Sequence, residues 1–74
     1  MVTIDELRAT VERMEQRYAA ATDPTIQSLM QAYRQLTPRF RADLQDERDY
    51  LLSCGAALML IQQVARQGAA PHQA

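Results

Sequence analysis

The chain offers few side chains for catalysis or for metal binding. His72 is the only histidine, so neither a catalytic triad nor a pair of histidine metal ligands can be assembled from this sequence. The sequence contains no lysine, which removes Schiff-base chemistry. Cys54 lies among apolar residues, where a thiol is usually buried and unreactive. We therefore expect a protein that is not an enzyme and that uses no cofactor.

Four carboxylates, those of Asp43, Asp46, Glu47 and Asp49, form an acidic cluster that has the right chemistry for a divalent cation. An EF-hand loop, however, needs its ligands at alternate positions around an invariant glycine, and this segment contains no glycine. Several arginines lie close by in the sequence, so we predict a solvated face with ion pairs and no metal site.

The strongest basic patch consists of Arg34, Arg39 and Arg41, flanked by Tyr33 and Phe40. Arginines beside a turn can contact DNA phosphates, so a small DNA-binding regulator is the alternative function for this chain. The formal net charge is −1 and the acidic cluster follows within two helical turns, which disfavours nucleic acid as a partner.

The elements that carry these residues are predicted to be helices, because the chain has only 2 glycines and 3 prolines. Thr3 and Glu6 have the spacing of a capping box at the start of a first helix, residues 4–21. The apolar positions of that helix recur every three or four residues and form one narrow stripe, which consists of Ile4, Leu7, Val11, Met14, Tyr18 and Ala21.

Asp23 and Pro24 predict a tight turn and the start of a second helix. Thr37 and Pro38 then allow two interpretations: a break that gives helices at 24–36 and 38–67, which we favour, or one long helix kinked at Pro38. Gly68 predicts the end of the last helix, and residues 68–74 are expected to form a flexible tail.

Residues 50–65 contain no charged side chain. In a helix their apolar side chains would point in nearly every direction, and such a helix must be buried on several sides. A domain of 74 residues buries little surface by itself, so we expect another protein chain, a second copy or a different protein, to cover this helix. The expected partner-binding residues are Leu51, Cys54, Leu58, Ile61 and Val64, with Val11, Met14 and Tyr18 as the opposing stripe.

The same charge-free stretch is shorter than the roughly 18 to 20 apolar residues that span a bilayer, so no membrane span is expected. The acidic start of the chain lacks the features of a secretory signal. We therefore expect a cytoplasmic protein.

The turn at Asp23 and Pro24, the segment LMQAY at 29–33 and the segment ALMLIQQ at 57–63 together resemble the small helical-hairpin components of bacterial type III secretion, the needle subunits and their co-chaperones. The resemblance covers roughly residues 22–67 and implies that Leu58, Ile61 and Val64 pack against a partner.

Together these features predict an all-α protein, a helical hairpin or a small three-helix unit with a long C-terminal helix. The predicted function is non-enzymatic: an interaction module, either an adaptor or a small chaperone-like protein, that self-associates or binds a partner helix.

Overall fold

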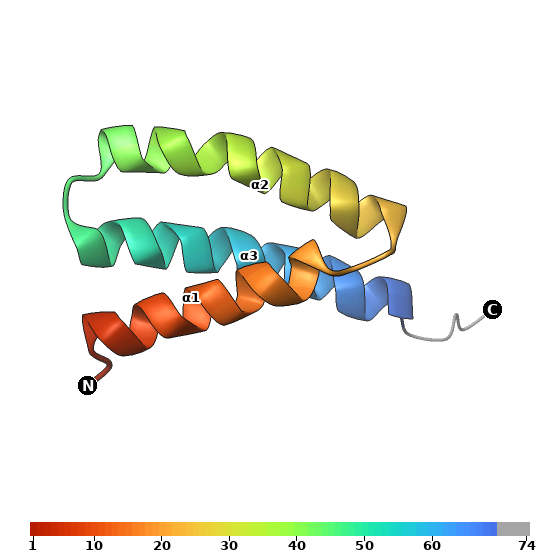
Figure 1. Cartoon of the computed structure of the whole chain (residues 1–74), viewed down its shortest axis with the longest axis horizontal. Helices are drawn as coiled ribbons and strands as arrows, with labels where there is room; N and C mark the ends of the chain where they lie inside the picture. Colours follow the sequence, from red (N-terminus) through yellow and green to blue (C-terminus); the bar gives the residue numbers. More distant parts are fainter. Residues whose placement is uncertain (70–74) are drawn as a thin grey trace.

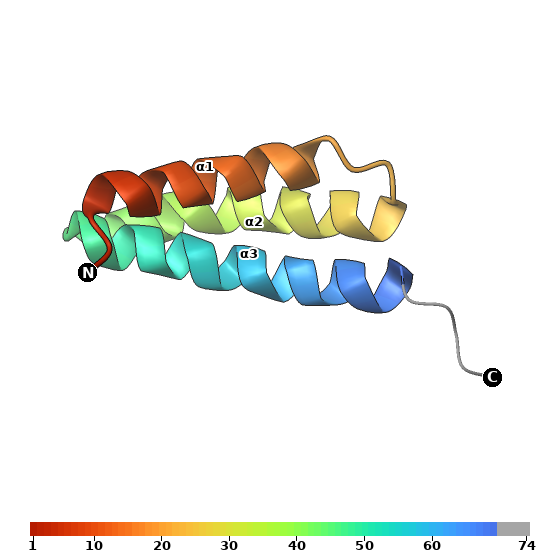
Figure 2. The ribbon, with the colours of Figure 1, turned by 90° about the horizontal axis from the view of Figure 1, so that it is seen from below.

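The computed structural model describes residues 1–69, which form three helices: α1 (Ile4–Ala19), α2 (Pro24–Asp43) and α3 (Glu47–Ala69) (Figure 1). The chain runs along α1, returns along α2 and runs back along α3. Views from two directions place α3 beside both other helices (Figures 1 and 2), and α1 and α2 make fewer contacts with each other than either makes with α3. The predicted all-α fold is confirmed in its three-helix form.

The first helix begins at the predicted capping box. The hydroxyl oxygen of Thr3 accepts from the Glu6 backbone N–H at 3.1 Å, and the Thr3 N–H donates to the Glu6 carboxylate at 3.0 Å. Each bond satisfies a backbone donor that the start of a helix leaves without a partner. The helix ends at Ala19, two residues before the predicted end.

The turn between α1 and α2 is also built as predicted. The Asp23 carboxylate accepts from the Thr25 N–H at 2.8 Å, and Pro24 occupies the start of α2, where its missing N–H costs nothing. The tight connection folds α2 back against α1 and α3.

The predicted break at Pro38 is wrong, because α2 continues through this residue to Asp43. A proline inside a helix removes the N–H that would bond to the carbonyl four residues earlier, here Arg34. In the structure the Thr37 hydroxyl donates to the Arg34 carbonyl oxygen at 3.3 Å. The side chain that we interpreted as a helix cap thus supplies a replacement donor, and the helix is maintained.

The chain instead turns at residues 44–46, so a single long helix kinked at Pro38 is wrong as well. Leu44 has an extended backbone, and the Asp46 carboxylate accepts from the Asp49 N–H at 3.1 Å, which is the bond of an N-cap. One member of the acidic cluster therefore starts α3. At its other end α3 runs to Ala69, beyond the predicted stop at Gly68, and residues 70–74, including His72, lie outside the described residues.

The core lies where α3 packs into the angle between α1 and α2. Leu58 is fully buried, and Cys54 is 1% exposed. The predicted stripe of α1 faces this core, with Val11 and Tyr18 buried and the remaining members partly buried. Two helices of the same chain therefore cover the inner side of α3, and our expectation that this side requires another polypeptide is wrong.

Candidate interaction surface

The residues predicted to bind a partner lie mostly in the core of the chain itself. Only Met14 and Val64 are partly exposed; the other six are buried: Val11, Tyr18, Leu51, Cys54, Leu58 and Ile61. The prediction that Cys54 is a buried packing residue is confirmed. The large apolar side chains that α2 and α3 leave exposed are those of Leu36, Leu52, Met59 and Leu60.

An apolar groove of about 190 Å³ lies between α2 and α3. We define it by its lining: Leu29, Ala32, Tyr33 and Leu36 from α2, and Ala57, Leu60, Ile61 and Val64 from α3. Tyr33 and Ile61 are buried, whereas Leu60 is 69% exposed and Leu36 is 40% exposed. Two leucine side chains, one on each helix, are therefore exposed to solvent at this groove.

The spacing of the apolar residues explains the shape of this groove. Leu29, Ala32 and Leu36 are three and four residues apart on α2, so they form a row on one side of the helix. On α3 a row with the same spacing consists of Ala57, Leu60 and Val64. The two alanines leave room that longer side chains would fill, and the rows give a groove of the kind that receives the apolar face of another helix.

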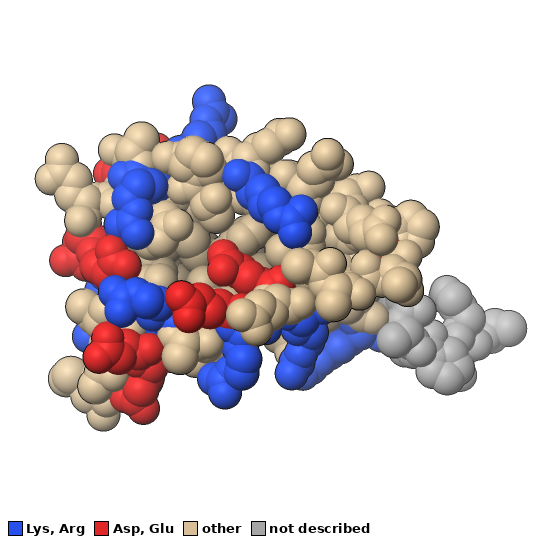
Figure 3. Space-filling view, viewed as in Figure 1, with Lys and Arg blue, Asp and Glu red and all other residues tan. Residues whose placement is uncertain are grey.

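The charged residues of the two helical segments that line the groove are arginines, and the nearest described carboxylate is that of Glu15 on α1, which accepts from the hydroxyl of the lining residue Tyr33 at 2.6 Å. Residues 24–42 of α2 carry only Arg34, Arg39 and Arg41, and residues 50–67 of α3 carry only Arg66. Arg39 lines a shallow depression that shares Ala32 and Leu36 with the groove. Figure 3 shows few acidic side chains over the right-hand part of the visible face, whereas red and blue side chains meet at its left-hand end.

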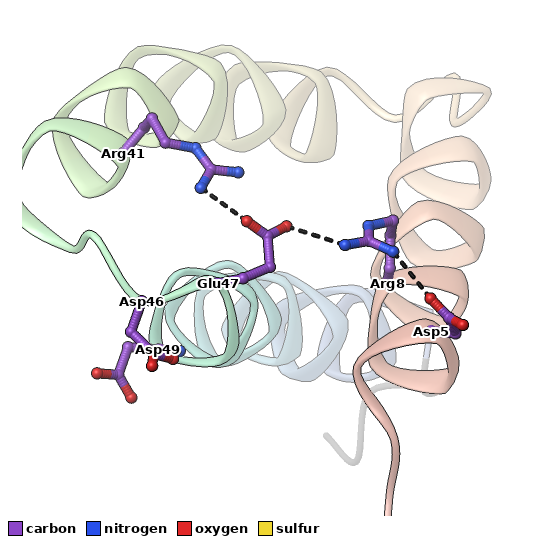
Figure 4. Close-up of polar contacts among 6 residues, drawn as sticks. All are labelled: Asp5, Arg8, Arg41, Asp46, Glu47 and Asp49. Carbon is purple, nitrogen blue, oxygen red and sulfur yellow. Dashed lines mark hydrogen bonds and ion pairs between the residues drawn. The ribbon is translucent and has the colours of Figure 1, made fainter.

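That charged end is held together by Glu47, which links all three helices (Figure 4). Its carboxylate accepts from Arg41 of α2 at 2.9 Å and from Arg8 of α1 at 3.3 Å, and Arg8 also pairs with Asp5 at 3.1 Å. Hydrogen bonds from Arg41 and then Arg8 lower the pKa of Glu47, and the bond to Glu47 raises the pKa of Arg41. The predicted ion pairs of the acidic cluster are thus present at Glu47.

A polar cavity of about 200 Å³ adjoins this network, with Arg8, Glu15, Arg41, Glu47 and Tyr50 in its lining. The Arg41 guanidinium also stacks over the Tyr50 ring, 3.5 Å from the ring centroid. Arg8, Arg41 and Glu47 are engaged with one another, and the Glu15 carboxylate accepts from the Tyr33 hydroxyl. Among residues 1–69, no group of three His, Cys, Asp or Glu side chains lies close enough to hold a metal ion.

The same contacts divide the basic patch that suggested DNA binding. Arg41 bonds to Glu47 and stacks on Tyr50, whereas Arg34 and Arg39 remain exposed on α2. An acidic partner thus already occupies the guanidinium of one of the three arginines.

Comparison of the chain with protein-family models, with curated proteins and with solved structures finds no match. The resemblance to type III secretion components therefore remains an expectation from the sequence. Within the described part of the chain, none of the helices combines the length and the hydropathy needed to cross a bilayer.

The exposed apolar residues of α2 and α3 differ from the residues that the sequence analysis singled out. Leu36 and Leu60 were not predicted as binding residues, although both belong to apolar rows that can be read from the sequence. What the sequence lacks is the position of α1, which decides the side of α3 that is covered.

Proposed function

We propose that this chain is a non-enzymatic protein-interaction module, of the adaptor or small chaperone type, whose groove binds an amphipathic helix of another protein. One observation carries the proposal: Leu36 and Leu60 are exposed on the two walls of the apolar groove between α2 and α3. Burial of a leucine side chain contributes about 1.5–3 kcal/mol, so covering these walls would favour association.

The shape of the groove favours a helix as its occupant. Its walls run along two neighbouring helices, and the lining residues recur at three- and four-residue spacing on both. Leucine or methionine side chains at i, i+3, i+4 and i+7 of a third helix would fit between such rows. Binding of a helix is also what the resemblance to type III secretion co-chaperones implies.

The charge around the groove favours an acidic partner. Arg39 lies beside the groove, and the lining segments 29–36 and 57–64 contain no carboxylate. Negative residues that flank the apolar face of a partner helix would complement Arg39 and speed association. We therefore expect a partner helix with an apolar face and acidic flanks.

The alternative function, DNA binding through Arg34, Arg39 and Arg41, has less support. Arg41 is engaged with Glu47 at 2.9 Å, and the chain has a net charge of −1. Phosphate binding would have to compete with that ion pair.

A synthetic helix tests the proposed function. The probe is a fluorescein-labelled amphipathic peptide with leucine at i, i+3, i+4 and i+7 and glutamate on its other faces, titrated with the protein by fluorescence anisotropy. Leu60→Ser should weaken binding about tenfold or more, because a leucine contact is lost. Leu52→Ser is a matched control, since Leu52 is also an exposed leucine of α3 but does not line the groove.

The controls make the outcome specific. A second peptide with lysine in place of glutamate should bind more weakly, and the difference should shrink as salt is added. Absence of binding by the glutamate peptide, or equal losses for Leu60→Ser and Leu52→Ser, would contradict the proposed function.

A further inference from the structure

A second surface of α3 adjoins the groove and shares none of its lining residues. Six residues recur along the helix at spacings of three and four, and we call them the outer stripe: Asp49, Leu52, Ala56, Met59, Gln63 and Arg66. All six are exposed, and the two large apolar members, Leu52 and Met59, are 52% and 59% exposed. The stripe therefore faces away from both α1 and α2.

The spacing of the outer stripe is the heptad pattern of a two-helix seam. With Asp49 at position a, the six residues occupy a, d, a, d, a and d, over a length of about 27 Å at 1.5 Å per residue. In a globular helix packed on only two neighbours, the outer side ordinarily carries charges. Here the four inner members of the stripe are uncharged.

The two ends of the stripe carry opposite charges. If two copies of α3 lie antiparallel, position a of one faces position d of the other. Asp49 then lies opposite Arg66 of the second copy, and the same pair forms again at the other end. In the middle, Ala56 lies opposite Met59, so a small residue meets a large one. Leu52 lies opposite the aliphatic part of Gln63.

We infer that the outer stripe binds a second copy of this chain, with the two α3 helices antiparallel and related by a twofold axis. A twofold interface requires a surface that complements itself, and the stripe satisfies this requirement in both charge and size. A parallel pair would place Asp49 against Asp49 and Arg66 against Arg66, which is unfavourable at both ends. A seam of one helix is smaller than a standard interface, so we expect a reversible dimer at micromolar or higher concentrations.

The outer stripe shares no residue with the lining of the groove, and Leu60, at position e of the same heptads, borders both surfaces. The two proposals can fail independently, because the ends of the stripe, Asp49 and Arg66, lie outside the groove lining and are tested separately from it.

Charge reversals at the ends of the stripe test the arrangement. Asp49→Arg should bring two arginines together at each end of the dimer, and Arg66→Asp should bring two carboxylates together. Each variant alone should dimerise about tenfold more weakly than the wild type in sedimentation equilibrium, because two attractive pairs become repulsive. An equimolar mixture of the two variants should form a heterodimer at least as tight as the wild-type dimer, since every end pair is again attractive.

The mixture separates this inference from loss of folding, because a misfolded variant would not pair on mixing. Arg34→Asp is the charge control, since it changes the net charge of −1 by the same two units as Arg66→Asp but lies on α2. It should dimerise like the wild type. The inference is overturned if the wild type stays monomeric up to millimolar concentration, if both single variants dimerise normally, if the mixture does not associate, or if Arg34→Asp is equally impaired.

Discussion

The hydroxyl of Tyr33 donates a hydrogen bond to the carboxylate of Glu15 at 2.6 Å and ties α2 to α1 at the edge of the core. Tyr33 is 3% exposed and also forms the floor of the groove. This contact keeps α2 at its place beside α1, and so it helps to set the distance between the groove's walls.

Removal of that hydroxyl should destabilise the fold. We expect Tyr33→Phe to lower the free energy of unfolding by about 1–2 kcal/mol, because a hydrogen bond to a carboxylate is lost while the ring remains packed. Urea denaturation measures the effect. In a double-mutant cycle with Glu15→Ala the two losses should not add; additive losses would show that the bond contributes nothing.

Alkaline pH should weaken the same contact. Burial, followed by the bond to Glu15, raises the pKa of Tyr33 above its ordinary value of 10.0, so the folded state favours the neutral phenol. The stabilisation is complete below the ordinary tyrosine pKa and is lost as the pH rises above it. The stability of the wild type should therefore fall as the pH rises above 10.0, and that of Tyr33→Phe should fall less; equal slopes would refute this assignment.

Acidic pH should act through Glu47. Its pKa lies below the ordinary 4.5 in the folded state because Arg41 and Arg8 donate to the ionised carboxylate. The contribution of Glu47 is therefore present above pH 4.5 and disappears as the pH falls through its lowered pKa. Glu47→Gln should show a shallower loss of stability in acid than the wild type, as followed by circular dichroism. Parallel curves of stability against pH for the two proteins would contradict this expectation.

Gly55 should tolerate a methyl group. An added Cβ would lie 3.9 Å from a methyl carbon of Val11, which is an ordinary van der Waals distance, and the residue is inside α3. Gly55→Ala should therefore raise the free energy of unfolding by about 0.5–1 kcal/mol through helix propensity. A lower melting temperature would mean that α1 approaches more closely at this point.

Pro38 should limit the stability of α2. In Pro38→Ala the restored N–H can bond to the Arg34 carbonyl, so we expect the free energy of unfolding to rise by about 1–3 kcal/mol, as measured by thermal denaturation. In the wild-type background Thr37→Val should lower the free energy of unfolding by about 1 kcal/mol, because the Arg34 carbonyl loses the Thr37 hydroxyl as its donor. The same change should cost less alongside Pro38→Ala. Equal costs in both backgrounds would argue against the compensating role of Thr37.

The sequence predicts the start of a helix correctly where the signal consists of neighbouring residues. The capping box at Thr3 and the turn at Asp23 depend on neighbouring residues only, and both are confirmed. At Pro38 the prediction was wrong because Thr before Pro is a local signal of a helix start, whereas in the structure the Thr37 hydroxyl bonds back to the Arg34 carbonyl inside a continuous helix. The true turn was missed because Asp46 was interpreted only as part of a charged face.

The exposed apolar surface of α3 could be predicted only in part, for a different reason. Periodicity shows that α3 has apolar residues on several sides, but it cannot show which sides the other two helices cover. Leu58 and Ile61 proved to be core residues, whereas Leu60 and Met59, adjacent to them in sequence, remain exposed. Which of these residues is buried depends on the angle at which α1 and α2 pack around α3.

The most direct test of the central claim, that a partner helix binds in the groove and leaves the core intact, is a titration of ¹⁵N-labelled protein with the glutamate-flanked peptide, followed by amide chemical shifts. We predict that the shifts change along residues 29–36 and 57–64, while the amides of α1 keep their positions and the spectrum stays dispersed. Changes centred on α1, or a collapse of the dispersion that shows the core opening to admit the peptide, would contradict the account.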